Sequence, residues 1–148
     1  MKGKEPVVIG IDLGGTKIYC AIVNSGGKIL ATARKKTKAA QGFENTVERI
    51  AKCAFEAAEK SGIDYEDVVA AGIGSPGPLD LKKGKIIETP NLKWTNAPIQ
   101  SRLESLLKRP VRVDNDGNVG LLGEHAYGTG KGADHLVGLF IGTGIGGG

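Results

Sequence analysis

Two turns rich in glycine and threonine, each directly after an apolar strand, are the first candidates for chemistry. The first spans residues 12–17 (DLGGTK) and the second residues 142–148 (GTGIGGG). Glycine lets backbone N–H groups face an anion without an intervening Cβ, and threonine adds a hydroxyl donor. Taken alone, the first turn fits an ordinary β-turn equally well, and the second fits a frayed glycine-rich end. Their recurrence favours phosphate binding, by the residues Gly14, Gly15, Thr16, Lys17, Gly142, Thr143, Gly144, Gly146 and Gly147.

The segment after the first turn indicates which kind of phosphate loop it is. A P-loop or a dinucleotide-binding loop requires a helix after its glycines. Residues 18–23 (IYCAIV) are instead apolar and β-branched, and they lead to the hairpin signal NSGG at 24–27. We therefore predict a phosphate-binding β-hairpin. Asp12, at the end of the first strand, is placed to hold a hydrated Mg²⁺ beside the phosphates.

A third motif, DNDGN at residues 114–118, follows a short strand. Phosphoryl transfer to a hydroxyl group needs one carboxylate that accepts the hydroxyl proton. Asp116, on a loop at a helix N-terminus, suits that role, and the Asn115 amide can bind neighbouring sugar hydroxyls. The motif is also a good turn and helix N-cap, so alone it leaves a structural role open. We expect Asp114 to point away and to cap or face solvent.

A glycine- and proline-rich loop at residues 72–78 (GIGSPGP) ends another apolar strand. Proline restricts its backbone, and rigid loops position small ligands well. We predict a substrate loop formed by Gly74, Ser75, Pro76 and Gly77, with Asn91 as a second reader of hydroxyl groups. Trp94 could form a wall of the same cleft, but core packing is the favoured interpretation of a lone tryptophan.

The elements that must position these motifs follow from hydrophobic periodicity. Three consecutive antiparallel strands are expected over residues 7–11, 18–23 and 28–37, and a helix with a helical apolar face over residues 42–61, ending at Gly62. A strand at 68–73, a helix from an Asn96 N-cap, and a strand at 111–113 come next. A short helix over 119–127 and a strand over 136–141 complete the order, which indicates an α/β domain with a mixed sheet.

Composition narrows the functional class. The net charge of +4 is spread along the chain and aromatic residues make up only 5%, which disfavours nucleic-acid binding. Cys20 and Cys53 lie in apolar patterns without metal-ligand spacing, so buried reduced thiols are expected. No apolar run has the length of a membrane span. We expect a cytoplasmic protein that has small-molecule partners and binds neither nucleic acid nor a membrane.

Taken together, the motifs resemble the ROK family of sugar kinases and sugar-responsive repressors, most closely its ATP-dependent glucokinases. Gly10 to Lys17 matches the family's first phosphate motif, and Gly142 to Gly148 its second. Residues 74–80 with Asn91 and Leu92 match the sugar-site loops, and residues 113–118 match the catalytic loop. The resemblance adds Gly10 to the cofactor-binding residues, and it implies that Asp116 is the general base and Asn115 a sugar ligand.

The resemblance also implies an actin-like ATPase (ribonuclease H-like) fold with a five-stranded sheet in the order βββαβαβ. Residues 1–115 would form the N-terminal domain and residues 116–148 the truncated beginning of a second lobe. The implied reaction is ATP- and Mg²⁺-dependent phosphorylation of a hexose, most simply glucose, by a homo-oligomer. Structural Zn²⁺ is expected only beyond Gly148, and we expect the chain alone to bind sugar weakly and turn over little.

Three alternatives remain. A kinase of another hexose or of an N-acetylhexosamine shares the same motifs, because residues beyond Gly148 would help to read the sugar. A sugar-sensing repressor of the family would carry a helix-turn-helix before the first phosphate motif, where only nine residues precede Gly10. An actin-like or chaperone-like ATPase would share the first hairpin without needing the Asn115-Asp116 loop.

Overall fold

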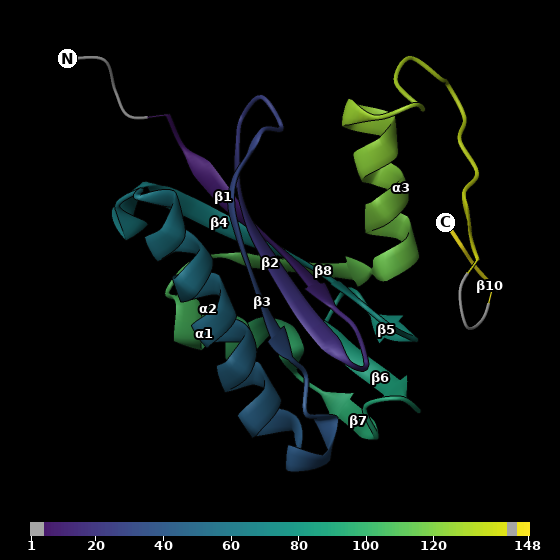
Figure 1. Ribbon diagram of the computed structural model, residues 1–148. Helices are drawn as coiled ribbons and strands as arrows, with labels where there is room; N and C mark the ends of the chain where they lie inside the picture. Colours follow the sequence, from purple (N-terminus) through teal and green to yellow (C-terminus); the bar gives the residue numbers. More distant parts are fainter. Residues whose placement is uncertain (1–4, 142–144) are drawn as a thin grey trace.

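A mixed five-stranded sheet forms the centre of the molecule, as Figure 1 shows. The computed structural model describes residues 5–141 and 145–148. The strands lie in the order β3-β2-β1-β4-β8; β1 to β3 are antiparallel neighbours, whereas β4 and β8 run parallel to β1. Their bounds are β1 Val7–Leu13, β2 Lys17–Asn24, β3 Ile29–Lys36, β4 Val68–Ser75 and β8 Val111–Asn115. The expected α/β class and the mixed five-stranded sheet are confirmed.

Helices α1 (Phe43–Ser61) and α2 (Ile99–Leu107) cover one face of this sheet (Figure 1). Helix α1 ends where Gly62 takes the left-handed conformation (φ 68°), which glycine adopts without steric cost. The expected Asn96 N-cap of α2 is wrong. Pro98 occupies the N-cap position, and Asn96 lies in a strand with φ 52°.

The core lies between the sheet and these two helices. Alternate side chains of the strands and one face of α1 are buried there. Cys20 and Cys53 are both free and buried, as expected. The two thiols meet across the β2–α1 contact: a hydrogen bond with Cys53, together with burial, raises the pKa of Cys20. Trp94 is buried and packs edge-on against Phe43 at 5.1 Å between ring centroids, which confirms its role in the core.

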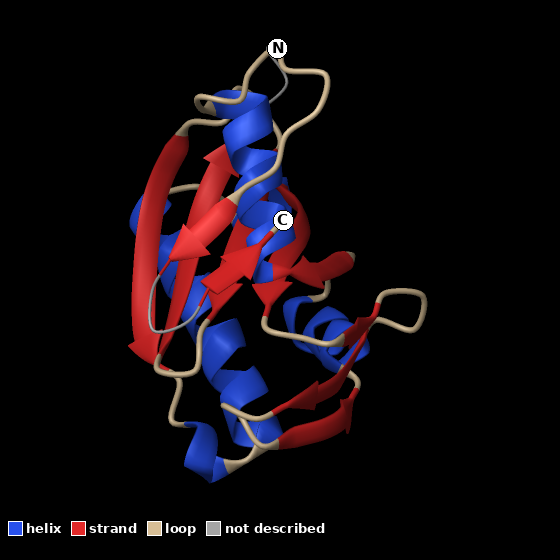
Figure 2. Ribbon diagram, turned by 90° about the vertical axis from the view of Figure 1, so that its right-hand side faces the viewer, coloured by secondary structure: helices blue, strands red, loops and turns tan. Residues whose placement is uncertain are grey.

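A second, three-stranded sheet interrupts the connection between β4 and α2, and the sequence patterns did not predict it. It contains β5 (Leu79–Asp80), β6 (Lys85–Thr89) and β7 (Trp94–Ala97) in antiparallel order. Figure 2 shows it below the main sheet, beside the helices. Two short 3₁₀ helices lie earlier in the chain: η1 (Ala39–Gln41) precedes α1, and η2 (Tyr65–Asp67) precedes β4.

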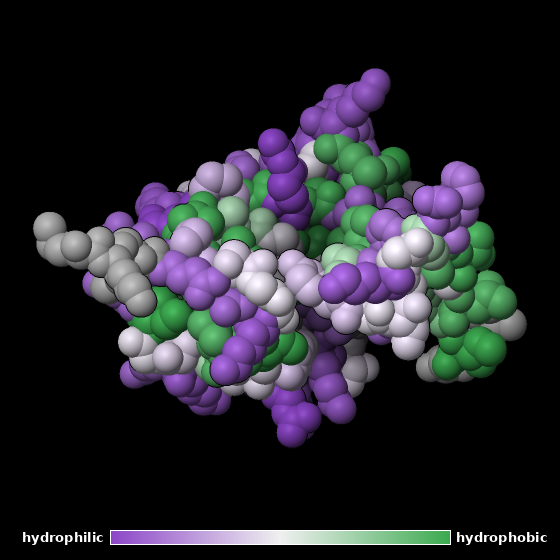
Figure 3. Space-filling view, turned by 90° about the horizontal axis from the view of Figure 1, so that it is seen from above, coloured by the Kyte–Doolittle hydropathy of each residue, from purple (hydrophilic) through white to green (hydrophobic). Residues whose placement is uncertain are grey.

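The last segment lies on the other side of the main sheet from α1 and α2 (Figure 1). It consists of α3 (Asp116–Tyr127) and a hairpin of β9 (Leu139–Ile141) and β10 (Ile145–Gly147). Helix α3 begins three residues before the expected start at 119, and β9 is shorter than the strand expected over 136–141. None of the residues of α3 is buried. Figure 3 shows apolar side chains gathered on the end of the molecule that carries this segment.

Within the described ranges, no helix combines the length and hydrophobicity needed to cross a membrane.

Candidate active site

The carboxyl ends of β1, β4 and β8 meet at one edge of the sheet and bring three predicted motifs together. In the strand register Asp12 lies opposite Gly74, Gly74 opposite Asp114, and Ser75 opposite Asn115. The ends of parallel strands at one sheet edge are the usual location of ligand sites in α/β folds. The phosphate hairpin, the substrate loop and the catalytic loop are therefore neighbours, although the sequence separates them by tens of residues.

Asp12 and Asp116 form an acidic pair at this edge. The pKa of Asp12 is raised above its ordinary value, first because burial disfavours its charged form and second because the Asp116 carboxylate repels it. Asp116 is exposed at the first turn of α3. A divalent cation between the two carboxylates would relieve this repulsion. The residues fit Mg²⁺, which proteins commonly hold through one or two carboxylates together with substrate phosphates.

Asn115 is the N-cap of α3, and the oxygen and the nitrogen of its side-chain amide face different partners. Its Oδ1 accepts hydrogen bonds from the backbone N–H groups of Gly117 (3.0 Å) and Asn118 (3.3 Å). Its Nδ2 faces the substrate loop, 3.9 Å from where a Cβ on Gly77 would stand. The cap fixes the oxygen and leaves the amide nitrogen to donate to a ligand. Asn115 can therefore cap α3 and bind a ligand at the same time.

Asp114 stabilises the loop before α3, whose N-cap is Asn115. Its Oδ1 accepts from the backbone N–H of Asn115 (2.6 Å) and from Nδ2 of Asn118 (3.2 Å). These bonds hold the loop that leads to Asp116, so Asp114 supports the site.

The substrate loop is packed tightly under α3. A Cβ on Gly74 would stand 2.6 Å from Val119 Cγ2 and 3.4 Å from the Asp116 Cα, so only glycine allows the helix to approach this strand end. Ser75 is fully buried, and its hydroxyl donates to the Pro76 carbonyl (3.1 Å). The hydroxyl of Ser75 therefore supports the loop. A ligand at this loop would meet backbone groups rather than this hydroxyl. The Gly77–Pro78 peptide bond is cis.

The first phosphate turn is closed by backbone hydrogen bonds and supported by Thr37. The Gly14 N–H donates to the Lys17 carbonyl (2.9 Å). Thr37, which is buried, donates its hydroxyl to the Gly14 carbonyl (2.7 Å) and its N–H to the Thr16 carbonyl (2.8 Å). Among the described residues, no partner accepts from the N–H groups of Gly15 and Thr16. These two donors are therefore available to bind an anion. Thr37 is a supporting residue that the sequence patterns did not indicate.

Asn91 and Gly10 lie at different distances from this turn. A Cβ on Gly15 would stand 3.4 Å from the Asn91 Cβ, so Asn91 borders the phosphate hairpin. Gly10 lies two residues before Asp12 on the same face of β1, in a hollow of about 630 Å³ that Gly72, Gly74 and Val119 also line. The structure thus brings Asn91 to the site, whereas Gly10 forms part of the sheet surface next to it.

The second phosphate motif lies against the start of α3. Gly142, Thr143 and Gly144 fall outside the described residues. Gly146 and Gly147 belong to β10, and a Cβ on Gly117 would stand 2.8 Å from the Gly147 carbonyl. A pocket of about 560 Å³ opens between the hairpin and the helix start. Its lining consists of Asn115, Asp116, Gly117, Phe140, Ile141, Gly146 and Gly147.

The family model described as "ROK family" matches residues 8–148. The chain belongs to the ROK family. The glucokinase of Thermotoga maritima is 39% identical over 142 residues, which are 95% of this chain and 43% of that protein. The glucokinase of Streptomyces coelicolor is 34% identical over 142 residues, again with 43% of its length covered. The chain therefore spans less than half the length of the curated ROK relatives that it matches.

Solved ROK structures share this fold. The ROK hexokinase from Thermus thermophilus has a TM-score of 0.85 and 37% identity, over 96% of this chain and 46% of that one. The ROK family glucokinase from Streptomyces griseus, solved in complex with glucose and AMPPNP, has a TM-score of 0.85 and 36% identity, over 95% of this chain and 43% of that one. The fold of the ROK kinases, the actin-like ATPase fold, is thereby confirmed for this chain.

Proposed function

We propose that this chain carries the catalytic edge of an ATP-dependent hexose kinase, with glucose as the acceptor. The observation that carries the proposal is the position of Asp116. It lines the pocket at the start of α3, close enough to Asp12 to raise the pKa of that residue. A carboxylate that can accept a proton thus stands beside a second one suited to a phosphate-bound cation. The glucokinase relatives and the glucose and AMPPNP of the Streptomyces griseus complex support the same substrates.

Each side chain has a defined task in this reaction. Asp116 accepts the proton of the attacking sugar hydroxyl, and Asn115 Nδ2 and Asn91 bind neighbouring hydroxyls beside the loop of Gly74 to Gly77. The N–H groups of Gly15 and Thr16 and the side chain of Lys17 hold the phosphates from one side, and the second motif holds them from the other. Mg²⁺, when bound, would neutralise charge on the transferring phosphoryl group, and Asp12 would hold it.

The domain boundary follows the same division. We propose that residues 1–115 form one domain and that residue 116 opens a second lobe, since β8 ends at Asn115 and α3 begins at Asp116. On this proposal Asp116 sits at the junction of the two units.

We also propose that the chain self-associates through the exposed apolar side chains of α3 and β9. Sedimentation velocity would test this. A strict monomer at micromolar concentration would contradict it.

Production of glucose 6-phosphate tests the proposed function. The chain itself and a chimera that adds the C-terminal part of the Thermotoga maritima glucokinase are each incubated with ATP, Mg²⁺ and a panel of hexoses. We expect hexose-dependent ADP release from the chimera, fastest with glucose, and little turnover by the chain alone. ADP release that does not depend on a hexose would instead indicate an actin-like ATPase. Hexose binding without any transfer would favour a sugar-sensing regulator.

A further inference from the structure

The first phosphate turn depends on a residue outside it for its shape. Gly14 and Gly15 are consecutive glycines, which adopt many backbone conformations at little steric cost. A backbone hydrogen bond from the Gly14 N–H to the Lys17 carbonyl closes the turn. Closure alone does not make an anion site, because each N–H donor must also be held in the direction of the anion. The residue that supplies this restraint is Thr37, which directly follows β3 and is fully buried.

Thr37 fixes the direction of a donor by binding the other end of its peptide unit. Its hydroxyl donates to the Gly14 carbonyl at 2.7 Å. In a trans peptide unit, the C=O of one residue and the N–H of the next lie in one plane and point in opposite directions. A Gly14 carbonyl that points at Thr37 therefore turns the Gly15 N–H away from the buried Thr37 side chain. Thr37 also donates its own N–H to the Thr16 carbonyl (2.8 Å), which holds a second peptide unit of the turn.

The peptide unit between Lys36 and Thr37 is in turn held from helix α1. Its carbonyl accepts hydrogen bonds from Nε (3.0 Å) and Nη2 (2.8 Å) of Arg49, in the second turn of that helix. Its N–H is the one that donates to the Thr16 carbonyl. A cation at the carbonyl of a peptide unit polarises the unit and strengthens its N–H as a donor. Arg49 is thus connected to the phosphate turn through one peptide unit.

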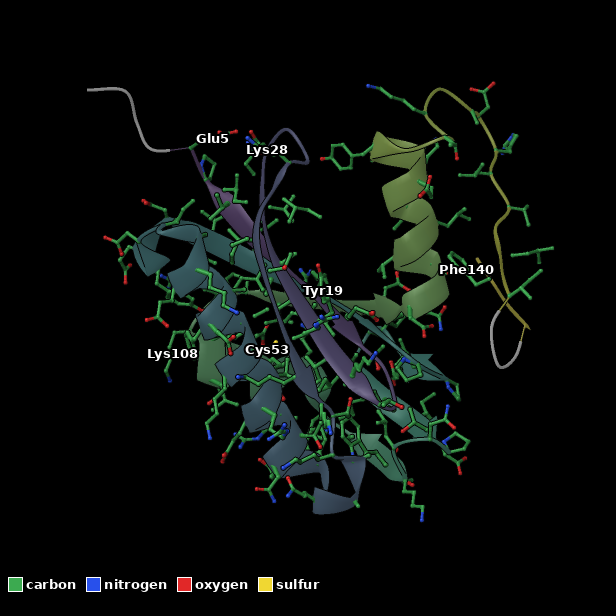
Figure 4. The ribbon with its side chains drawn as sticks, in the orientation of Figure 1. Glu5, Tyr19, Lys28, Cys53, Lys108 and Phe140 are labelled. Atoms are coloured by element: carbon green, nitrogen blue, oxygen red, sulfur yellow. The ribbon has the colours of Figure 1, made fainter. Side chains whose placement is uncertain are left out.

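Arg49 itself stands on a helix that is anchored in the core. Helix α1 lies along β2 and β3, and in Figure 4 side chains fill the space between this helix and the sheet, among them that of Cys53. Val47 and Ile50, on either side of Arg49 in the sequence, are both fully buried. The backbone that carries Arg49 therefore cannot shift without disturbing this core. The shape of the phosphate turn is set from the packed part of the molecule.

We propose that Thr37, supported by Arg49, is a positioning residue for phosphate binding, because it directs the Gly15 N–H toward the phosphates of ATP. The inference rests on the proposed kinase function and adds two residues that do not touch the ligand themselves. Loss of either one lets the peptide unit between Gly14 and Gly15 rotate, so that a donor to the phosphates is lost. The effect falls on ATP binding and leaves sugar binding unchanged.

A matched pair of buried threonines isolates this role. Thr46 of α1 is also fully buried, and its hydroxyl also donates to a glycine carbonyl, that of Gly42 (2.9 Å) at the start of the helix. Isothermal titration measures the affinity of the chain for Mg-ATP. We expect Thr37→Val to lower it about tenfold, since one charge-assisted hydrogen bond is lost. Thr46→Val should change it less than about twofold. Thr37→Ser keeps the hydroxyl and should restore the affinity to within about twofold of the wild type.

Variants of α1 test the contribution of Arg49 without a change in a buried side chain. Arg49→Met removes both hydrogen bonds to the Lys36 carbonyl, whereas Lys52→Met removes an exposed charge from the same helix. We expect ATP affinity to fall about threefold in Arg49→Met and to stay within about twofold in Lys52→Met. Arg49→Lys keeps the charge without the planar pair of donors, so it should resemble Arg49→Met. Equal affinities of Arg49→Met and Lys52→Met would remove Arg49 from the proposal.

Two further readouts separate positioning from a general loss of stability. The ¹H–¹⁵N signal of the Gly15 amide in the chain without ligand should move in Thr37→Val and stay in place in Thr46→Val. In the chimera, Thr37→Val should raise KM for ATP about tenfold and leave KM for glucose within about twofold. Circular dichroism melting checks that the variants are folded. If Thr37→Val does not fold, the comparison of Arg49→Met with Lys52→Met decides.

Three results would overturn the proposal: wild-type ATP affinity in Thr37→Val, an equal loss of affinity in Thr46→Val, or a Gly15 signal that Thr37→Val leaves in place. Failure of the proposed function is a separate outcome. If the chimera phosphorylates a hexose and Thr37→Val leaves KM for ATP unchanged, only this inference fails. If Thr37→Val weakens ATP binding but the parent chimera phosphorylates no hexose, Thr37 keeps its role and the kinase assignment fails.

Discussion

The two sides of the candidate site are supported very differently. Asp12 and Gly74 lie on strands that pack against α1 and α2. The core between them is fully buried: Ile9 of β1, Ile50 of α1 and Leu103 of α2 are each 0% exposed. Asp116 and Gly147 belong to the segment of α3, β9 and β10, where no helical residue is buried and Leu139 is 73% exposed. The phosphate hairpin thus stands on a packed core, whereas the proposed base stands on a helix that buries none of its residues.

Because α3 has no core beneath it, the distance between the Asp12 and Asp116 carboxylates has to be set by a few close contacts. At its start α3 is held to the sheet by Gly74, which meets both Val119 and Asp116, and at its far end Tyr127 packs against Gly27 in the turn between β2 and β3. The cap bonds of Asn115 and the contact of Gly117 with Gly147 add to them. A few close contacts therefore set the distance between the two carboxylates, without a core beneath the helix.

The largest expected effect contrasts one leucine from each region. Leu103→Ala removes a fully buried side chain and should lower the free energy of unfolding by about 2–5 kcal/mol. Leu122→Ala, at a side chain that is 60% exposed on α3, should change it by less than about 0.5 kcal/mol. Urea denaturation of both variants measures the contrast. Equal losses would show that α3 has a core of its own.

Two glycines on the same face of β4 test the contact between the regions. Gly74→Ala should cost about 1–3 kcal/mol, because its Cβ would collide with Val119. Gly72→Ala has nothing within 4 Å of the new Cβ and should be neutral or slightly stabilising. Thermal melts report the stabilities, and the chemical shift of the Asn115 side-chain amide reports the site. An unchanged Asn115 signal in Gly74→Ala would argue against this contact as the determinant of the site.

The third test removes the charge of Glu56, a carboxylate on α1 in the packed region. Hydrogen bonds from Lys35, then from Lys60, lower the pKa of Glu56 to about 2. A depressed pKa means that the stabilisation is present above the ordinary value of 4.5 and is lost as the pH falls through about 2. Glu56→Gln should therefore be less stable than the wild type at pH 7, and the difference should vanish near pH 2. A difference that is independent of pH would rule out the ion pair as its source.

The opposite sign is expected at the site, with a smaller effect. Because the pKa of Asp12 is raised, its contribution to stability is present below the ordinary value of 3.8 and is lost as the pH rises through the folded-state pKa. Asp12→Asn should therefore be more stable than the wild type at pH 7 and not at pH 3. Chemical denaturation at both pH values measures this. A destabilised Asp12→Asn at pH 7 would contradict the repulsion between Asp12 and Asp116.

Much of the packed region was predictable from sequence, because its signals are local. The periodicity of α1 and the stop at Gly62 predicted that helix, and apolar β-branched runs predicted β1, β2 and β4. The short strands β5 to β7 were missed because two to five residues carry too little alternation. Asn96 misled the prediction of α2, since its side chain suits an N-cap but its backbone lies in β7.

The site was predictable only in part, because it forms through register. Asp12, Asn115 and Asp116 were chosen for their residue types and for the family resemblance, and their roles stay predictions. Their meeting at one edge depends on the pairing of β1 with β4 and of β4 with β8, which no single segment encodes. Thr37 was not foreseen for the same reason: its contact with the Gly14 carbonyl exists only once β3 has paired with β2.

The role of Asp116 is the central claim, and one measurement tests it most directly. In the chimera with the Thermotoga maritima C-terminal part, Asp116→Asn is compared with Asp134→Asn, a change at an exposed loop residue. The account predicts that Asp116→Asn lowers kcat for glucose phosphorylation by about 10²–10⁴-fold, with glucose affinity within about twofold, and that Asp134→Asn leaves both unchanged. Turnover of Asp116→Asn within a few-fold of the parent chimera would contradict the assignment of Asp116 as the base.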